Sequence, residues 1–174
     1  MRLFLALVPP TEVRCRLGGL ADRLHRELGG RRIPDTNFHL TLAFLGEQPP
    51  ETASHLLAWL GTKRLSPDAW TLDRVGHFRG PGIIWAGARR PPDTLMAVQA
   101  RLSEELRAQG IELRPRRFLP HVSLLRNTMP NAAQLFTEQA FRWPYTQIHL
   151  IQSVASPQGS CYRSLGSTQD VALP

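Results

Sequence analysis

The sequence is poor in cysteine and contains a single lysine. Cys15 and Cys161 are the only cysteines in 174 residues, and neither belongs to a Cys-x-x-Cys motif. Such usage is typical of a reducing cytoplasm and argues against a disulfide framework or a cysteine-ligated zinc site. We therefore expect a cytoplasmic protein. Lys63 lies in no adenylation motif, and the absence of a Gly-x-x-x-x-Gly-Lys-Ser/Thr loop argues against chemistry that needs nucleotide activation.

Long hydrophobic runs are also missing. No stretch approaches the roughly 18–20 consecutive apolar residues of a membrane span. The apolar opening at residues 2–8 is no convincing signal peptide, because Pro9-Pro10 stands where a small-residue cleavage site belongs. We expect a strand there. With 42% hydrophobic and 20% charged residues, the chain is long enough for one globular domain.

The charge is unbalanced in favour of cations. Lys and Arg number 21 against 14 Asp and Glu, which gives a formal net charge of +7. A positive field attracts polyanions, so nucleic acid is one candidate partner. Coding bias toward arginine explains the arginine-to-lysine ratio equally well. The net excess still requires a partner or a role in solubility.

A short strand-like motif occurs twice. The first copy is His39-Leu40-Thr41-Leu42, and the second is His121-Val122-Ser123-Leu124. In a β-strand, alternation places the histidine and the hydroxyl on one face and the aliphatic pair on the other. Burial in a core explains the aliphatic residues. It does not explain an imidazole and a hydroxyl repeated in the same register.

The two copies are separated by 82 residues, and other features repeat with the same spacing. Among them are two proline pairs, a leucine pair and the first strand of each half, at Pro9-Pro10 and Pro91-Pro92, Leu20/Leu24 and Leu102/Leu106, and 3–6 and Trp85-Ala86. The period exceeds the roughly 20–50 residues of solenoid repeats. We predict a gap-free duplication within a single domain, with pseudo-symmetric halves at about 1–80 and 81–174.

The hydrophobic periodicity predicts an α+β fold. Each half reads as strand–helix–strand–helix–strand, giving a bilobal protein with mostly antiparallel sheets around a central cleft. The expected helices are 11–28, 51–61, Asp93 to Gly110 and 131–140. The expected strands are 2–8, 37–45, 69–78, 83–87, 119–126, 146–154 and 160–166, with a short edge segment at 111–113.

The repeated motif suits proton transfer at a phosphate. Across a shared groove, one imidazole can take a proton from a nucleophile while the other protonates a leaving oxygen, each role contributing about 10²–10⁴-fold. Residues two apart on one strand face lie about 6.5–7 Å apart, so Thr41 and Ser123 can donate hydrogen bonds to the phosphoryl oxygens. Arg126 can stabilise charge on the same oxygens. The sequence does not say whether His39 or His121 is the base.

Two other interpretations of the histidines were weighed. A lone histidine on a strand is usually structural, but two in one register, each with a hydroxyl at the same offset, disfavour that reading. A catalytic zinc site needs about three protein ligands, and each strand offers one, so we expect no metal. The remaining histidines are expected to be solvated or structural: His25, His55, His77 and His149.

The paired motif resembles the signature of the two-histidine phosphoesterase superfamily. Within it, several stretches are similar to the bacterial and archaeal RNA 2′,3′-cyclic phosphodiesterases, also called 2′-5′ RNA ligases. The similarity covers nearly the whole chain, and Ser123 stands where threonine is commoner, which keeps the hydroxyl. The stretches are 1–7, His39 to Gly46, 84–87, 118–121 and Gly159 to Leu165.

This resemblance implies a function in RNA processing. His39 and His121 would be catalytic, Thr41 and Ser123 would bind the substrate phosphate, and Arg126 would be a supporting cation, without metal or nucleotide cofactor. The reaction would convert a terminal 2′,3′-cyclic phosphate on RNA, tRNA fragments included, to a 2′-phosphate, with ATP-independent 2′-5′ ligation when an RNA 5′-hydroxyl replaces water. We expect a monomer, because the duplication already supplies the symmetry. A non-catalytic RNA- or nucleotide-binding module and a phosphodiesterase for small cyclic nucleotides are the alternatives.

Overall fold

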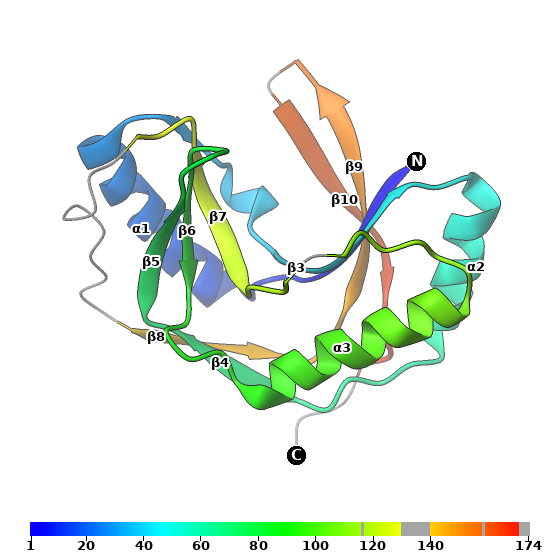
Figure 1. The fold of residues 1–174 in the computed structure, drawn as a ribbon. Coiled ribbons are helices and arrows are strands. Elements are labelled where there is room, and N and C mark those ends of the chain that lie inside the picture. Colours follow the sequence, from blue (N-terminus) through cyan, green and yellow to red (C-terminus); the bar gives the residue numbers. More distant parts are fainter. Residues whose placement is uncertain (116, 130–139, 158, 171–174) are drawn as a thin grey trace.

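Two four-stranded sheets, a two-stranded ribbon and three α-helices make up the described part of the molecule (Figure 1). The computed structural model describes residues 1–115, 117–129, 140–157 and 159–170. The helices are α1 Thr11–Leu28, α2 Pro50–Gly61 and α3 Asp93–Ala108. All three were predicted. The helix predicted at 131–140 falls outside the described residues except for its last position. No helix in the described ranges is long and apolar enough to cross a membrane.

The strands pair antiparallel in every sheet, as the sequence predicted. The first sheet has the order β10-β9-β1-β3, the second β2-β7-β6-β5, and the ribbon pairs β4 with β8. A 3-10 turn, η1 (Asp35–Asn37), precedes β3. The strands are β1 Arg2–Leu7, β2 Arg31–Arg32, β3 Leu40–Glu47, β4 Asp68–Leu72, β5 Arg74–Phe78, β6 Ile83–Gly87, β7 His121–Arg126, β8 Phe141–Tyr145, β9 His149–Ser156 and β10 Gly159–Ser167.

Several details of the predicted elements were wrong, among them the following. The single strand expected at 69–78 is two strands, β4 and β5, which belong to different sheets. The strand expected at 146–154 begins later, as β9. Residues 111–113 form no strand.

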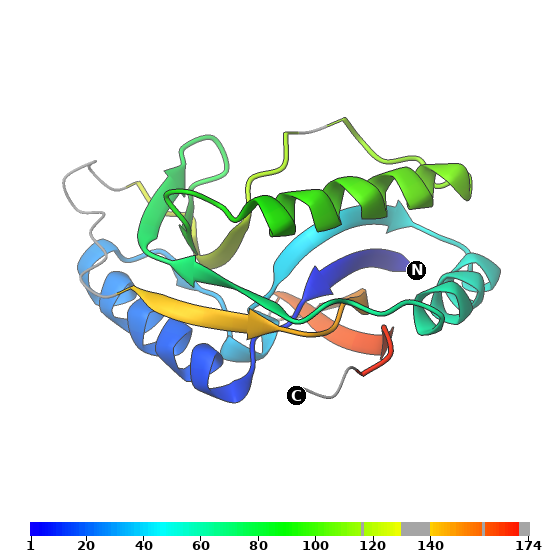
Figure 2. The same ribbon diagram turned by 90° about the horizontal axis from the view of Figure 1, so that it is seen from below.

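The sheets draw their strands from both ends of the chain. β9 and β10 complete the sheet begun by β1 and β3, while β2 and β5 flank β6 and β7. The helices cross over as well. α1 follows β1 but packs on β2 and β7 of the second sheet, and α3 follows β6 but packs on β3 of the first (Figures 1 and 2). The sequence halves therefore interleave in space, and the duplication itself stays a prediction.

The helices dock through the apolar stripes that their spacing indicates. α1 buries Val13, Leu17, Leu20 and Leu24, which recur at three- and four-residue steps. Pro10 precedes this helix, and Gly29 ends it with φ of 66°. Each fully buried leucine contributes about 1.5–3 kcal/mol relative to exposure. This packing holds the motif strand β7 against α1.

Candidate active site

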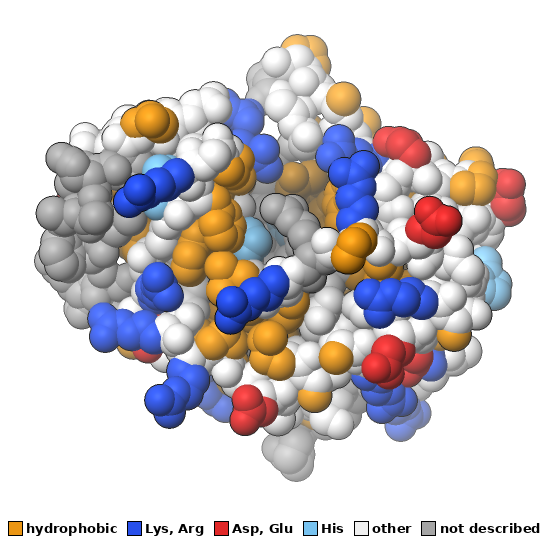
Figure 3. Space-filling model, viewed as in Figure 1, with side chains coloured by type: hydrophobic (Ala, Val, Ile, Leu, Met, Phe, Trp, Pro, Cys, Tyr) orange, Lys and Arg blue, Asp and Glu red, His pale blue; other side chains and the backbone are white. Residues whose placement is uncertain are grey.

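The two motif strands lie next to each other where the two four-stranded sheets meet: β3 belongs to the first sheet and β7 to the second. β3 and β7 are in contact, and each is paired with the strand that begins its half, β1 or β6. The face above them is hollowed, with a histidine visible in the hollow, apolar side chains beside it, and Lys or Arg side chains around it (Figure 3). This arrangement matches the predicted central cleft.

His39 is held immediately before β3 by its own backbone. Its Nδ1 lies 2.7 Å from the carbonyl oxygen of Asn37, and its Nε2 lies 3.0 Å from the Thr41 hydroxyl. A carbonyl only accepts, so Nδ1 carries the hydrogen and donates it. In the neutral ring Nε2 is then the acceptor, and the Thr41 hydroxyl donates to it. The predicted neighbours His39 and Thr41 are therefore in direct contact.

His121 is anchored in the same way at the start of β7. Its Nδ1 lies 2.7 Å from the carbonyl oxygen of Leu119, two residues upstream as in the first motif. The same reasoning puts the hydrogen on Nδ1, so Nε2 is the basic nitrogen of the neutral ring. Ser123 follows on β7, opposite Trp85 of β6. The two motifs thus share their local construction as well as their sequence pattern.

Aromatic rings flank both imidazoles. His39 packs between Phe4, at 4.8 Å between ring centroids, and Tyr162, at 5.0 Å. His121 meets the Phe78 ring edge-on at 4.9 Å. The motifs alone gave no sign of these neighbours, because each comes from a different predicted strand. The rings limit the water around each imidazole and restrict its orientation.

The site brings His39, His121 and Arg126 within electrostatic reach of one another. Burial lowers the pKa of His39 to about 4, while the hydrogen bond to the Asn37 carbonyl opposes the shift. The positive charges of His121 and Arg126 contribute to the same lowering. His39 is therefore neutral at pH 7 in the free protein.

A β-bulge explains why Arg126 faces the site. Strict alternation would place a residue three positions after Ser123 on the opposite face. However, Ser123 pairs with Trp85 while Leu125 pairs with the adjacent Ile84, so β7 contains an extra residue. Leu125 and its predecessor are both fully buried, and Arg126 returns to the exposed side. Bulges commonly re-aim side chains beside active sites.

The first motif strand contains the same irregularity. Thr41 pairs with Ala6, whereas Ala43 pairs with the adjacent Leu5. The position that corresponds to Arg126 is Phe44, whose side chain is 44% exposed beneath the guanidinium of Arg2. The two equivalent positions therefore differ: β7 carries an arginine, and β3 carries an aromatic ring that is covered by the arginine of β1.

The described side chains offer no cluster of metal ligands. Within the described ranges, no group of three or more His, Cys, Asp or Glu side chains is placed to hold a metal ion. Among the remaining histidines, His25 and His55 are exposed on helices, as expected. His149 bonds Ser164, with 3.2 Å between its Nδ1 and the hydroxyl oxygen, and burial lowers its pKa.

Comparison with known proteins first shows a similarity to LigT-like phosphoesterases. The family model of LigT-like phosphoesterases matches residues 7–85. The crystal structure of Escherichia coli LigT in apo form superposes with a TM-score of 0.81 at 30% identity, covering 97% of this chain and 98% of that one. Its complex with 3′-AMP gives a TM-score of 0.80.

Sequence relatives narrow the assignment. The RNA 2′,3′-cyclic phosphodiesterase of E. coli strain K12 is 32% identical over 144 residues, covering 83% of this chain and 81% of that protein. The Thermus thermophilus protein of the same name is 32% identical over 180 residues, covering 95% and 88%. The chain belongs to the RNA 2′,3′-cyclic phosphodiesterase family of LigT-like phosphoesterases.

Proposed function

We propose that this protein hydrolyses terminal 2′,3′-cyclic phosphates on RNA to 2′-phosphates, with His39 and His121 as its acid–base pair. One observation supports this most directly: both imidazoles are fixed through Nδ1 to a carbonyl two residues upstream. Nδ1 is therefore engaged in the same way in both rings, and in this proposal Nε2 is the nitrogen that transfers protons in each. The charges of His121 and Arg126 act on His39, which is the proximity that a shared phosphate requires.

The lowered pKa of His39 divides the two roles. Neutral His39 takes a proton from water through Nε2 as the water oxygen bonds to phosphorus. The bond between phosphorus and the 3′ oxygen breaks, and protonated His121 gives its Nε2 proton to that oxygen. The products are a 2′-phosphate and a 3′-hydroxyl. His39 ends protonated and His121 neutral, and exchange with solvent restores both.

Three further side chains stabilise the phosphate in this proposal. The Thr41 hydroxyl, which donates to His39 in the free protein, turns to a phosphoryl oxygen, and Ser123 does the same from the other wall. Arg126 offsets the charge that builds on these oxygens in the transition state. An RNA 5′-hydroxyl in place of the attacking water would give its proton to His39 in the same way. Its bond to phosphorus, with loss of the 3′ oxygen, would form a 2′-5′ linkage without ATP.

The direct test uses an oligonucleotide that ends in a 2′,3′-cyclic phosphate. We expect its conversion to a 2′-phosphate, at an undiminished rate in EDTA, because two imidazoles fall short of the three ligands of a catalytic zinc site. Product position is read by phosphorus NMR. A 3′-phosphate product, or activity lost to EDTA and restored by zinc, would contradict the proposal. Tight binding without product would instead favour the non-catalytic binding module.

Removing either hydroxyl should weaken transition-state binding. We expect Thr41→Val and Ser123→Ala each to lower kcat/KM by about 10²-fold, since one lost donor to a developing oxyanion costs about that much. Thr41→Ser and Ser123→Thr keep the hydroxyl and serve as matched controls that retain most activity. Steady-state kinetics on the same oligonucleotide measure the effect. Equal losses in the control variants would show that shape, and not the hydroxyl, matters at these positions.

A further inference from the structure

Two arginines lie directly opposite each other at the edge of the second sheet. Arg31 of β2 pairs with Arg126 of β7, and both side chains are exposed. Cross-strand neighbours share a face, with Cβ atoms about 4.5–5.5 Å apart, and like charges in such a pair destabilise the sheet. Nothing in the packing of the sheet requires this pair.

The neighbouring Arg32 differs from Arg31 because its charge is neutralised by carboxylates. Arg32 forms ion pairs with Asp22, at 2.5 Å, and with Asp35, at 2.7 Å. Within the described ranges, neither Arg31 nor Arg126 forms an ion pair with a carboxylate. The two residues of β2 therefore differ: Arg32 is paired with carboxylates, whereas Arg31 has no carboxylate partner among the described residues. Two arginines on paired positions of one sheet edge, without a carboxylate partner in the described ranges, are suited to an external phosphate.

The backbone around the pair is built to bring the two arginines together. Gly30 has a φ of 78°, and a Cβ there would lie 2.6 Å from the carbonyl oxygen of Arg126. Glycine therefore lets the end of α1 turn tightly into β2. The Arg31 guanidinium reaches across to the β9–β10 hairpin, where a Cβ on Gly159 would come within 2.7 Å of its Nη1.

Position relative to the histidines defines which phosphate the pair can take. Arg126 is close enough for its charge to lower the pKa of His39, so its side chain borders the reacting phosphate. Arg31 is one strand farther out, between β7 and the hairpin of the first sheet. An RNA chain that leaves the histidines along this edge would pass Arg126 first and Arg31 next, so its next phosphate would come within reach of these two arginines.

We propose that Arg31, together with Arg126, binds the phosphodiester immediately 5′ to the terminal cyclic phosphate. Arg31 is then a specificity residue that makes the enzyme prefer RNA ends to cyclic mononucleotides. This inference rests on the proposed phosphodiesterase function. Arg31 would distinguish RNA ends from cyclic mononucleotides by the negative charge of that one internal phosphodiester, which mononucleotides lack.

The test compares three substrates: a 2′,3′-cyclic mononucleotide, a dinucleotide that ends in the cyclic phosphate, and the same dinucleotide with a neutral methylphosphonate linkage. We expect the native protein to lose about tenfold in kcat/KM when the linkage is neutral. Arg31→Gln should lower kcat/KM on the charged dinucleotide by about tenfold. This variant should then show no further loss when the linkage is made neutral. Arg31→Lys should recover part of the loss.

Arg107→Gln is the matched control, because Arg107 is an exposed arginine on α3 without an ion pair in the described structure. It should leave all three rates unchanged. The salt dependence of log kcat/KM on the charged dinucleotide should become shallower by about 0.7 in Arg31→Gln and stay the same in Arg107→Gln. Equal rates of the native protein on the charged and neutral dinucleotides would overturn the role of Arg31 alone. No turnover of any of the three would overturn the proposed function and this inference together.

Discussion

Alanine at His121 is expected to lower kcat for cyclic phosphate hydrolysis by about 10²–10⁴-fold, the usual effect of losing one positioned acid or base. In the proposed mechanism the 3′ oxygen would leave without a proton, and no other described side chain has been placed to supply it. The fold should persist, because His121 lies at the first position of β7 and its side chain is only partly buried. Stopped-time assays and circular dichroism measure the two effects separately.

Alanine at His39 should give a loss of similar size, and the double variant should lose little more than either single one. Groups that act as one unit are strongly non-additive, because the second contributes nothing once the first is gone. His55→Ala is the matched control, since His55 is exposed on α2 and bonds Gln109. If both single variants kept more than a tenth of the native kcat while folded, the paired-histidine mechanism would be wrong.

The pairing of each histidine with its hydroxyl was predictable because it is local. A strand has a period of two, so four residues suffice to put His39 and Thr41, or His121 and Ser123, on one face. The helices were equally accessible, because α1 and α3 carry long stripes at helical spacing. In the structure His39 and Thr41 are within hydrogen-bond distance, and His121 and Ser123 are both partly buried positions at the start of β7.

The bulges were not predictable, because they depend on which residues face each other across two strands. Arg126 was selected for its closeness to the motif, yet it reaches the motif's face only through the extra residue in β7. The pairing of the first strands shows a separate departure from the gap-free comparison of the halves. Both halves share the bulge, so the bulges do not cause this departure. Thr41 pairs with Ala6 and Ser123 with Trp85, so these partners are 79 residues apart, whereas the hydroxyls are 82 apart.

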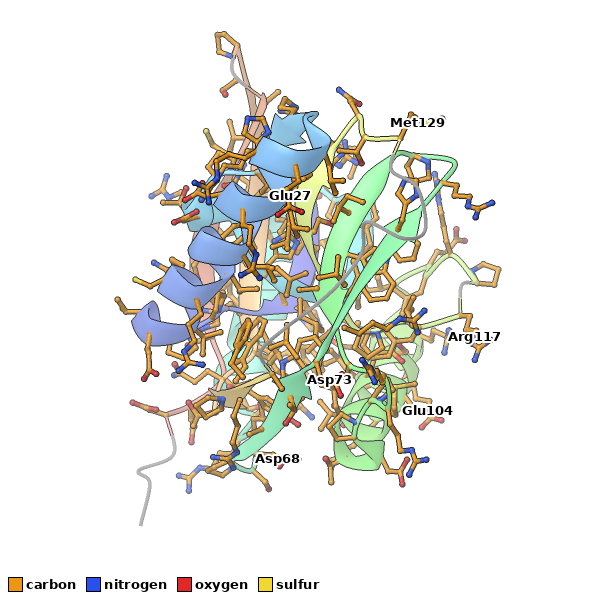
Figure 4. The ribbon with its side chains drawn as sticks, turned by 90° about the vertical axis from the view of Figure 1, so that its left-hand side faces the viewer. Glu27, Asp68, Asp73, Glu104, Arg117 and Met129 are labelled. Carbon is orange, nitrogen blue, oxygen red and sulfur yellow. The ribbon has the colours of Figure 1, made fainter. Side chains whose placement is uncertain are left out.

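Sheet membership was also beyond reach of the sequence. The alternation of residues over 69–78 predicts one strand. The chain instead leaves the ribbon after β4 and enters the second sheet as β5, with Asp73 between the two strands (Figure 4). There the Asp73 carboxylate accepts a hydrogen bond from the backbone N–H of Arg89, at 2.7 Å. The proximity of Arg31 to Arg126 is likewise a tertiary fact, since 95 residues separate them. The site's cationic edge therefore emerges only in the folded chain.

Acid should destabilise the folded protein through His39. Its pKa is about 4 in the folded state and about 6.5 in an unfolded chain. Between these values the unfolded state binds a proton that the folded state does not, so the free energy of unfolding falls as pH falls from 6.5 to 4. At about 1.4 kcal/mol per pKa unit, His39 contributes a loss of up to about 3 kcal/mol across this window. His149, whose pKa is also lowered by burial, adds in the same direction.

The contribution of His39 can be isolated with His39→Gln, because glutamine can still donate to the Asn37 carbonyl but does not titrate. Denaturant unfolding of both proteins from pH 4 to pH 8 gives the free energy of unfolding of each. The native value minus the variant value should be constant above pH 6.5 and should fall as the pH is lowered below 6.5. Inorganic phosphate should counter the change, since an anion beside Arg126 and His121 offsets the charges that lower the His39 pKa. A difference that is flat down to pH 4 would mean that His39 titrates normally. It would also remove the reason for assigning it as the base.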